Sequence, residues 1–324
     1  MDDAVMTLSS EAPVEAVLRD ELAQGDIVLG TVGPVLGHLL ANHDHSLFSD
    51  EIVSRVRGMV GDLARQLLTA QAEAADGADP RGYAERHRAS LTEALLTDSR
   101  LTSHCHALAL EWQLTTRLEA RNAIDPVLSP LLQSLVASDD TDTASTAMAA
   151  LAAQARFVQR QRRMELPLNE LPADHFHQSL AIWNGHVHPT DAAAGLAATT
   201  RLREDYDESA GRIGLLARLV HGMGAGVLAA LSVSHAGAAI FLSALASATQ
   251  QERELAVIAT NDRQLARLAL SLRAAGLRPQ AVEEQFAYIH PDVALPEGFE
   301  ALRTDRAQAL LASSPRVSAA RSCK

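Results

Sequence analysis

The feature that most constrains this chain is a run of apolar residues with helical spacing between Ser49 and Ala75. At about 100° per residue, seven of them fall within an arc of roughly 120°. Such a stripe predicts an amphipathic surface helix that faces a core, whereas Arg55, Asp62 and Arg65 lie off the arc. The seven apolar residues are Ile52, Val53, Val56, Met59, Val60, Leu63 and Leu67.

Composition extends the helical prediction to the whole chain. Its 324 residues include 59 alanines and 47 leucines, which are among the best helix formers. Aromatic residues make up 3%, and β-branched, aromatic-rich runs typical of strands are missing. We therefore predict an all-α fold, either a multi-helix bundle or stacked helical hairpins. Further helices are expected near residues 83–97, 99–122, 126–137, 144–164, 172–183, 190–204, 208–222, 223–231, 235–249, 251–259, 261–275, 279–288 and 303–312.

Two polar breaks suggest how the chain is divided. The first, residues 76–82, ends the helix described above, and the second, residues 138–143, is the best candidate for a domain boundary. The sequence thus predicts an N-terminal helical domain (1–137) and a C-terminal helical domain (144–312). Residues 313–324 are expected to be a disordered tail.

Charge and cysteine content restrict partner and compartment. The net charge of −12 disfavours nucleic acid and anionic lipid, because a duplex-binding protein needs a basic surface to replace counterions. The two cysteines, Cys105 and Cys323, form no Cys-x-x-Cys motif, which suits a reducing compartment. The acidic start, Met1-Asp2-Asp3, lacks the basic and apolar regions of a signal peptide. We therefore expect a cytoplasmic protein.

The stretch Leu219–Gln251 contains no Asp, Glu, Lys or Arg and is long enough to span a bilayer. It is rich in Gly, Ala and Ser, and it contains His221 and His235, which is unlike a strong membrane-spanning helix. We expect two fully buried core helices that pack closely through small residues. A membrane span is the alternative.

Eight of the 13 histidines fall in four His-x-His pairs, and in a helix residues two apart point about 200° from each other. One metal ion therefore cannot take both members of a helical pair. The pairs on helical segments are expected to be surface or half-buried imidazoles. The four pairs are His43/His45, His104/His106, His175/His177 and His186/His188.

The last pair differs because Asn184-Gly185 precedes it and Pro189 follows it, which predicts a loop. Alternate side chains of an extended segment share one side. His186, His188 and Asp191 are therefore predicted to converge on a divalent metal ion. The other interpretation is a polar loop in which Asp191 caps the next helix.

Three arginines give the clearest interaction signal. The spacing of Arg156, Arg160 and Arg163 places them on one helical stripe, near the end of a helix where positive charge is favoured. In an acidic chain this local basic ridge is suited to bind an acidic partner or a phosphate. The alternative is a solvated face that pairs with the protein's own carboxylates.

The C-terminal half contains short helical motifs. They are Phe241-Leu242-Ser243-Ala244-Leu245-Ala246, Arg267-Leu268-Ala269-Leu270 and Arg273-Ala274-Ala275-Gly276-Leu277, with Asp125-Pro126-Val127-Leu128-Ser129-Pro130-Leu131 in addition. On these motifs it resembles an uncharacterised all-helical proteobacterial family of unknown function. The resemblance implies a helical bacterial protein but no activity or site residue.

No segment carries a catalytic signature. There is no Gly-x-Ser-x-Gly motif and no glycine-rich phosphate loop after a strand, and Cys105 is expected to be a small core residue. We therefore predict a non-enzymatic interaction or regulatory protein whose partner has an acidic surface. The first alternative is a metal-dependent hydrolase that uses the histidine loop. The second is a bundle that binds a small molecule or lipid through the helices of residues 219–251.

Overall fold

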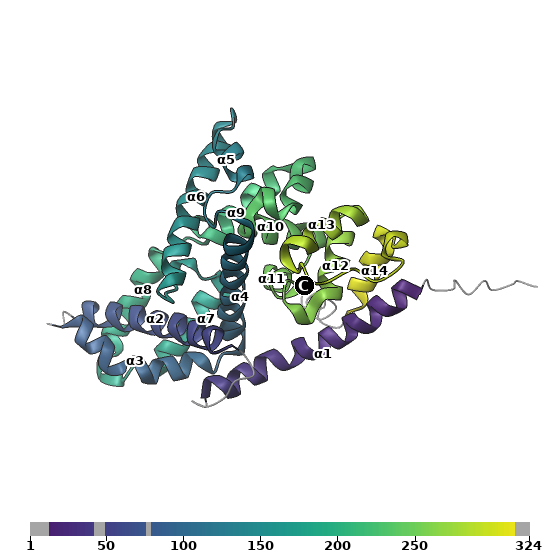
Figure 1. Cartoon of the computed structure of the whole chain (residues 1–324). Coiled ribbons are helices and arrows are strands. Elements are labelled where there is room, and N and C mark those ends of the chain that lie inside the picture. Colours follow the sequence, from purple (N-terminus) through teal and green to yellow (C-terminus); the bar gives the residue numbers. More distant parts are fainter. Residues whose placement is uncertain (1–12, 42–48, 76–78, 315–324) are drawn as a thin grey trace, which may run out of the picture.

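The computed structural model describes residues 13–41, 49–75 and 79–314, and these residues form helices and no strands. The all-α prediction is confirmed (Figure 1). The α-helices are α1 (Pro13–Ala41), α2 (Asp50–Ala74), α3 (Pro80–Leu96), α4 (Ser99–Asn122), α5 (Pro130–Val136), α6 (Thr141–Arg162), α7 (Ala173–His186), α8 (Ala192–Glu204), α9 (Arg212–Gly222), α10 (Val233–Thr249), α11 (Arg253–Ala259), α12 (Leu265–Ala274), α13 (Pro279–Ile289) and α14 (Thr304–Ser313). The 3₁₀ helices are η1 (Leu168–Glu170), η2 (Pro189–Asp191), η3 (Glu208–Ala210), η4 (Gly224–Leu231), η5 (Asp262–Gln264) and η6 (Phe299–Ala301).

Helix α2 is the amphipathic helix that the sequence predicts. The Ser49 hydroxyl accepts a hydrogen bond from the Ile52 N–H, which satisfies one of the free amides of the first turn. Helix α2 packs against α3, α4 and α8, and six of the seven stripe residues are buried. Local capping and the helical repeat therefore account for both the position of α2 and the face that it buries.

Two charged residues of α2 are buried although they lie off its apolar stripe. The end of α6 and the segment that follows it cover them: Arg55 donates to the carbonyl of Gln161, and Asp62 accepts from the Leu166 N–H at 3.1 Å. Gly58 allows this segment to lie close, because a Cβ atom there would be 2.6 Å from the Cβ of Met164. The polar side of α2 is thus a packing surface for a later part of the chain.

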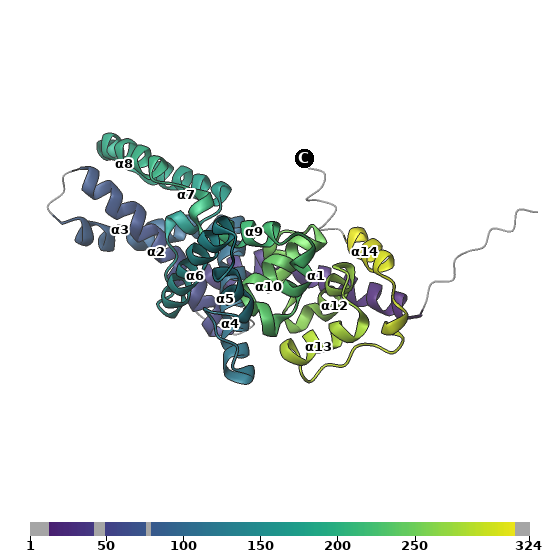
Figure 2. The same ribbon diagram turned by 90° about the horizontal axis from the view of Figure 1, so that it is seen from above.

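Helix α4 lies at the centre of the molecule. It packs against helices on one side that include α2, α3 and α7, and on the other against α10, α11 and α13 (Figure 1). Figure 2 shows α2, α3, α7 and α8 extending away from the body that contains α10 to α14. Because so much of its surface is covered, side chains on several faces of α4 are buried.

One continuous cluster of buried hydrophobic residues contains residues from both sides of the predicted boundary at 138–143, for example Leu63 and Leu242. The division into domains 1–137 and 144–312 remains a prediction, and the two parts share this core. Helix α14 ends at Ser313, and Ser314 is buried where it accepts a hydrogen bond from Arg267. The rest of the predicted tail, residues 315–324, lies outside the described residues.

The uncharged stretch Leu219–Gln251 is only partly as expected. Helix α10 is a buried core helix, and Gly237, with a φ of 69°, allows a kink against the side chain of Ser129. The preceding segment is the 3₁₀ helix η4, in which Leu228 is 56% exposed, so the expectation of two fully buried helices is wrong here. Within the described ranges, no helix is both long and apolar enough to cross a membrane.

Candidate metal centre

The loop residues predicted to bind metal have other partners. His186 ends α7, and its Nε2 atom lies 3.0 Å from the Ser90 hydroxyl of α3. His188 contacts Thr190 at 2.9 Å through Nδ1, and Asp191 ends η2. In the part of the chain that the structure describes, these residues do not form a group of ligand atoms close enough for one ion. Metal binding by His186, His188 and Asp191 remains a prediction without support from this geometry.

A different group is brought together by three helices. His104 of α4, His175 of α7 and Glu254 of α11 each offer one ligand atom, and these atoms all lie within 4.8 Å of one another. The His104 Nδ1 atom is 2.8 Å from Glu254 Oε1, and the two imidazole rings are 4.9 Å apart between centroids. His104 is buried, whereas His175 and Glu254 are half-buried. The group therefore lies at the edge of the core.

Local sequence places each ligand near the start of its helix. The Asp98 carboxylate accepts hydrogen bonds from the Arg100 and Leu101 N–H groups and fixes the first turn of α4, so that His104 comes in its second turn. Pro172 precedes α7 and ends the irregular segment after η1, which places His175 in the first turn. Glu254 is the second residue of α11.

The protonation states suit a cation. Burial alone would raise the pKa of Glu254, but its hydrogen bond with His104 and nearby positive charge outweigh that effect and lower the pKa to about 2. Burial lowers the pKa of His175, because it disfavours the charged imidazole. At neutral pH the group thus offers a carboxylate and a neutral imidazole, which are the forms that bind metal.

One of the three residues also has a buried nitrogen without a partner. His104 is 2% exposed, and its Nε2 atom has no hydrogen-bond partner among the described residues. Buried polar atoms are normally paired, and an exception calls for a specific explanation. Two imidazoles and one carboxylate form a donor set that Zn²⁺ accepts in proteins, with a fourth position left open in catalytic sites.

A buried ion cluster fixes the two helices that carry His104 and Glu254. Glu111 lies two turns beyond His104 on the same face of α4, and it accepts hydrogen bonds of 2.7–2.9 Å from both Arg212 and Arg253. The Arg212 guanidinium also lies over the Phe157 ring, 3.6 Å from its centroid. Because Arg253 directly precedes Glu254, its pair with Glu111 holds the start of α11 against α4.

Cys105 and His106, which follow His104 on α4, are also buried, and neither is one of the three converging residues. Cys105 is fully buried, as expected, and burial raises the pKa of its thiol to about 12, so it is not a thiolate ligand.

His104 and His106 are buried at 2% and 4% exposure, so the prediction of surface or half-buried imidazoles is wrong for this pair. It is confirmed for His175, which is half-buried, and for His177, which is exposed. His43 and His45 lie outside the described residues.

The sequence contained no signal for this candidate metal centre. The two His-x-His pairs contribute one histidine each, and the third ligand comes from a helix late in the chain. Spacing rules detect ligands that share one helix or loop. Ligands contributed by three packed helices can be found only when the packing is known.

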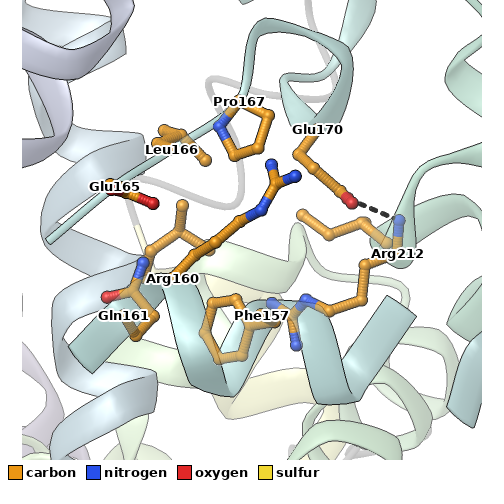
Figure 3. Close-up of a pocket in the computed structure, with 10 residues that line it drawn as sticks. Phe157, Arg160, Gln161, Glu165, Leu166, Pro167, Glu170 and Arg212 are labelled. Carbon is orange, nitrogen blue, oxygen red and sulfur yellow. Dashed lines mark hydrogen bonds between the residues drawn. The ribbon is translucent and has the colours of Figure 1, made fainter. Parts of the chain in front are cut away.

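The arginine ridge is divided in the structure. Arg156 is exposed on α6, and Arg163, the residue after α6, is exposed with its Nε atom 3.9 Å from a Glu165 carboxylate oxygen. Arg160, between them, is half-buried and lines a pocket (Figure 3). The three side chains therefore do not form one exposed surface.

Comparison of this chain with models of protein families, with curated proteins and with solved structures gives no match. The resemblance of the C-terminal half to an uncharacterised family remains a prediction. Function must therefore be argued from the chemistry of the sites and not from the fold.

Proposed function

We propose that this is a helical protein that binds a divalent transition metal ion through His104, His175 and Glu254. One observation carries the proposal: three side chains with metal-binding atoms, from three helices far apart in the sequence, converge within 4.8 Å of one another. The buried His104 Nε2 atom, which has no hydrogen-bond partner among the described residues, supports it, since an ion bound at that nitrogen would satisfy it.

The donor set also bears on the chemistry that a bound ion would support. Three protein ligands leave a coordination position for water, and a metal-bound water is a nucleophile near neutral pH. The half-buried His175 and Glu254 give this position a side near solvent. The hydrolase alternative is therefore better supported at this group than at the loop of His186 and His188.

The first prediction concerns metal content and affinity. We expect the wild-type protein to bind one Zn²⁺ or Co²⁺ per chain, and the Co²⁺ form to show the visible absorption bands of a nitrogen- and oxygen-ligated ion. His175→Ala and Glu254→Gln should each weaken binding by at least about a hundredfold, because loss of a ligand exceeds the effect of losing an outer-shell partner. Elemental analysis and competition with a chromogenic chelator measure both quantities.

Matched controls lie on α7 and just after it. His177→Ala removes an exposed imidazole of α7, and His186→Ala with His188→Ala removes the histidine that ends α7 and the one that follows it. All three changes should leave affinity unchanged. A wild-type protein that binds neither ion contradicts the proposal, as does loss of metal in the loop variant with retention in Glu254→Gln.

Interaction with an acidic protein is a second candidate function. Arg156 and Arg163 are both exposed and lie seven residues apart, on one face at the end of α6. Arg156 has no hydrogen-bond or ion-pair partner in the described ranges, and the pair of Arg163 with Glu165 is long. Two such cations on one face are suited to a partner with an acidic surface.

The second prediction tests this basic surface with an acidic peptide as the probe. Arg156→Glu with Arg163→Glu should weaken binding of a polyglutamate peptide at least about tenfold, and added salt should weaken wild-type binding. Arg81→Glu with Arg86→Glu, two exposed arginines of α3, is the control with the same charge change. Equal loss in both variants, measured by fluorescence anisotropy, would mean that only net charge matters.

A further inference from the structure

A partly enclosed pocket lies where the end of α6 meets α9 and the segment between α6 and α7 (Figure 3). About 340 Å³ of space lies in and above it when the open mouth is counted, so a ligand there would extend into the mouth. Half of the ten lining residues are apolar, and apolar atoms make up most of the exposed lining surface. The apolar residues are Leu108, Phe157, Leu166, Pro167 and Ile213.

Arg160 is the pocket's available cation. Its guanidinium extends into the pocket beside Pro167 and Glu170 (Figure 3), and no carboxylate of the described residues lies within ion-pair distance of it. Arg212, the other arginine of the lining, is already paired with Glu111. A half-buried guanidinium without an anion is a ready partner for a carboxylate, which it can bind through two hydrogen bonds.

Two carboxylates also line the pocket. Glu170 is held in place because its Oε2 atom accepts the backbone N–H of Arg212 at 2.7 Å (Figure 3). Glu165 is half-buried, and within the described part of the chain its carboxylate has only the long pair to Arg163. A simple carboxylic acid that reached Arg160 would therefore be repelled by neighbouring negative charge. A simple amine would leave Arg160 without a partner.

The wall of the pocket is fixed before any ligand binds. The segment that follows α6 is tied to α2 by the hydrogen bond from the Leu166 N–H to Asp62 and by one of 3.1 Å from the Leu168 N–H to Gln66. Met164, at the start of this segment, has a φ of 57°, a left-handed conformation that is costly for a residue with a side chain. A wall held in this way loses little conformational entropy on binding.

We propose that this pocket binds a small apolar α-amino acid. The carboxylate of the ligand pairs with Arg160, its ammonium group pairs with Glu170, and its side chain lies on the apolar wall. Only a ligand with both charges matches one available cation beside two carboxylates. The proposal does not depend on metal binding.

Isothermal titration calorimetry with L-valine, L-leucine and L-phenylalanine tests the pocket. At least one of them should bind the wild-type protein, and Arg160→Gln should weaken that binding at least about tenfold, because a charged hydrogen-bonded pair is lost. Arg156→Gln removes an exposed arginine one turn earlier on α6 and should bind as the wild type does. His175→Ala should also bind normally, which separates this result from the metal proposal.

Analogues test the requirement for two charges. 4-Methylpentanoate lacks the ammonium group of leucine and 3-methylbutylamine lacks its carboxylate, and each should bind at least about tenfold more weakly than leucine. The proposal is overturned if none of the three amino acids binds, if Arg160→Gln binds as well as the wild type, or if either analogue matches leucine. Circular dichroism of each variant shows that it is folded.

Discussion

Glu111→Ala is expected to lower the free energy of unfolding by roughly 3–5 kcal/mol, the range found when one partner of a buried ion pair is removed. Glu111 is fully buried and accepts hydrogen bonds from both Arg212 and Arg253. Its removal leaves the buried Arg212 and the partly buried Arg253 without this carboxylate. The low pKa of Glu111, which follows because the two arginines outweigh the effect of burial, shows the same stabilisation of the anion.

Urea unfolding followed by circular dichroism measures this change. Glu119→Ala is the matched control, since Glu119 is exposed on the same helix and its loss should change stability by less than about 0.5 kcal/mol. Glu111→Gln keeps the size of the side chain but removes its charge, and should also be strongly destabilised. A loss in Glu111→Ala that is no larger than in Glu119→Ala would contradict a stabilising role for the cluster.

Because of His106, the free energy of unfolding should fall as the pH is lowered. Burial lowers the pKa of this imidazole from 6.5 to about 4, because the charged form is disfavoured in the core. Between these values the unfolded chain binds a proton that the folded protein does not, so stability falls as the pH is lowered. His106 alone should remove about 3 kcal/mol of stability between pH 6.5 and 4.

His106→Gln removes this titration, so the difference in unfolding free energy between wild type and variant should depend on pH in that window. His221→Gln, at an exposed position of α9, is the control and should leave the pH dependence unchanged. Glu254 titrates at lower pH, because its pKa falls from 4.5 to about 2, and its contribution is lost only below pH 4.5. Parallel pH profiles for wild type and His106→Gln would refute the assignment.

The sequence by itself determined where most helices after residue 49 form, whereas α1 (Pro13–Ala41) was not among the expected helices. Their ends depend on neighbours within one turn: Ser49, Asp98 and Asp140 each accept a hydrogen bond at the start of a helix, and Gly276 takes a left-handed conformation after α12. The helical repeat also identified the apolar face of α2. These features could be read from the residues because a helix is stabilised by bonds between residues three or four apart.

Only the tertiary structure decided which polar side chains are buried and which meet. Asp62 is off the apolar stripe of α2, yet the backbone of Leu166, 104 positions later, donates a hydrogen bond to it. His104 shares no sequence pattern with Glu254, but α4 and α11 pack so that they touch. Arg160, which the sequence placed on the exposed basic ridge, lines a pocket instead. Such contacts depend on how distant helices pack, and that depends on the shape and volume of the whole core, which the pattern of any single helix does not contain.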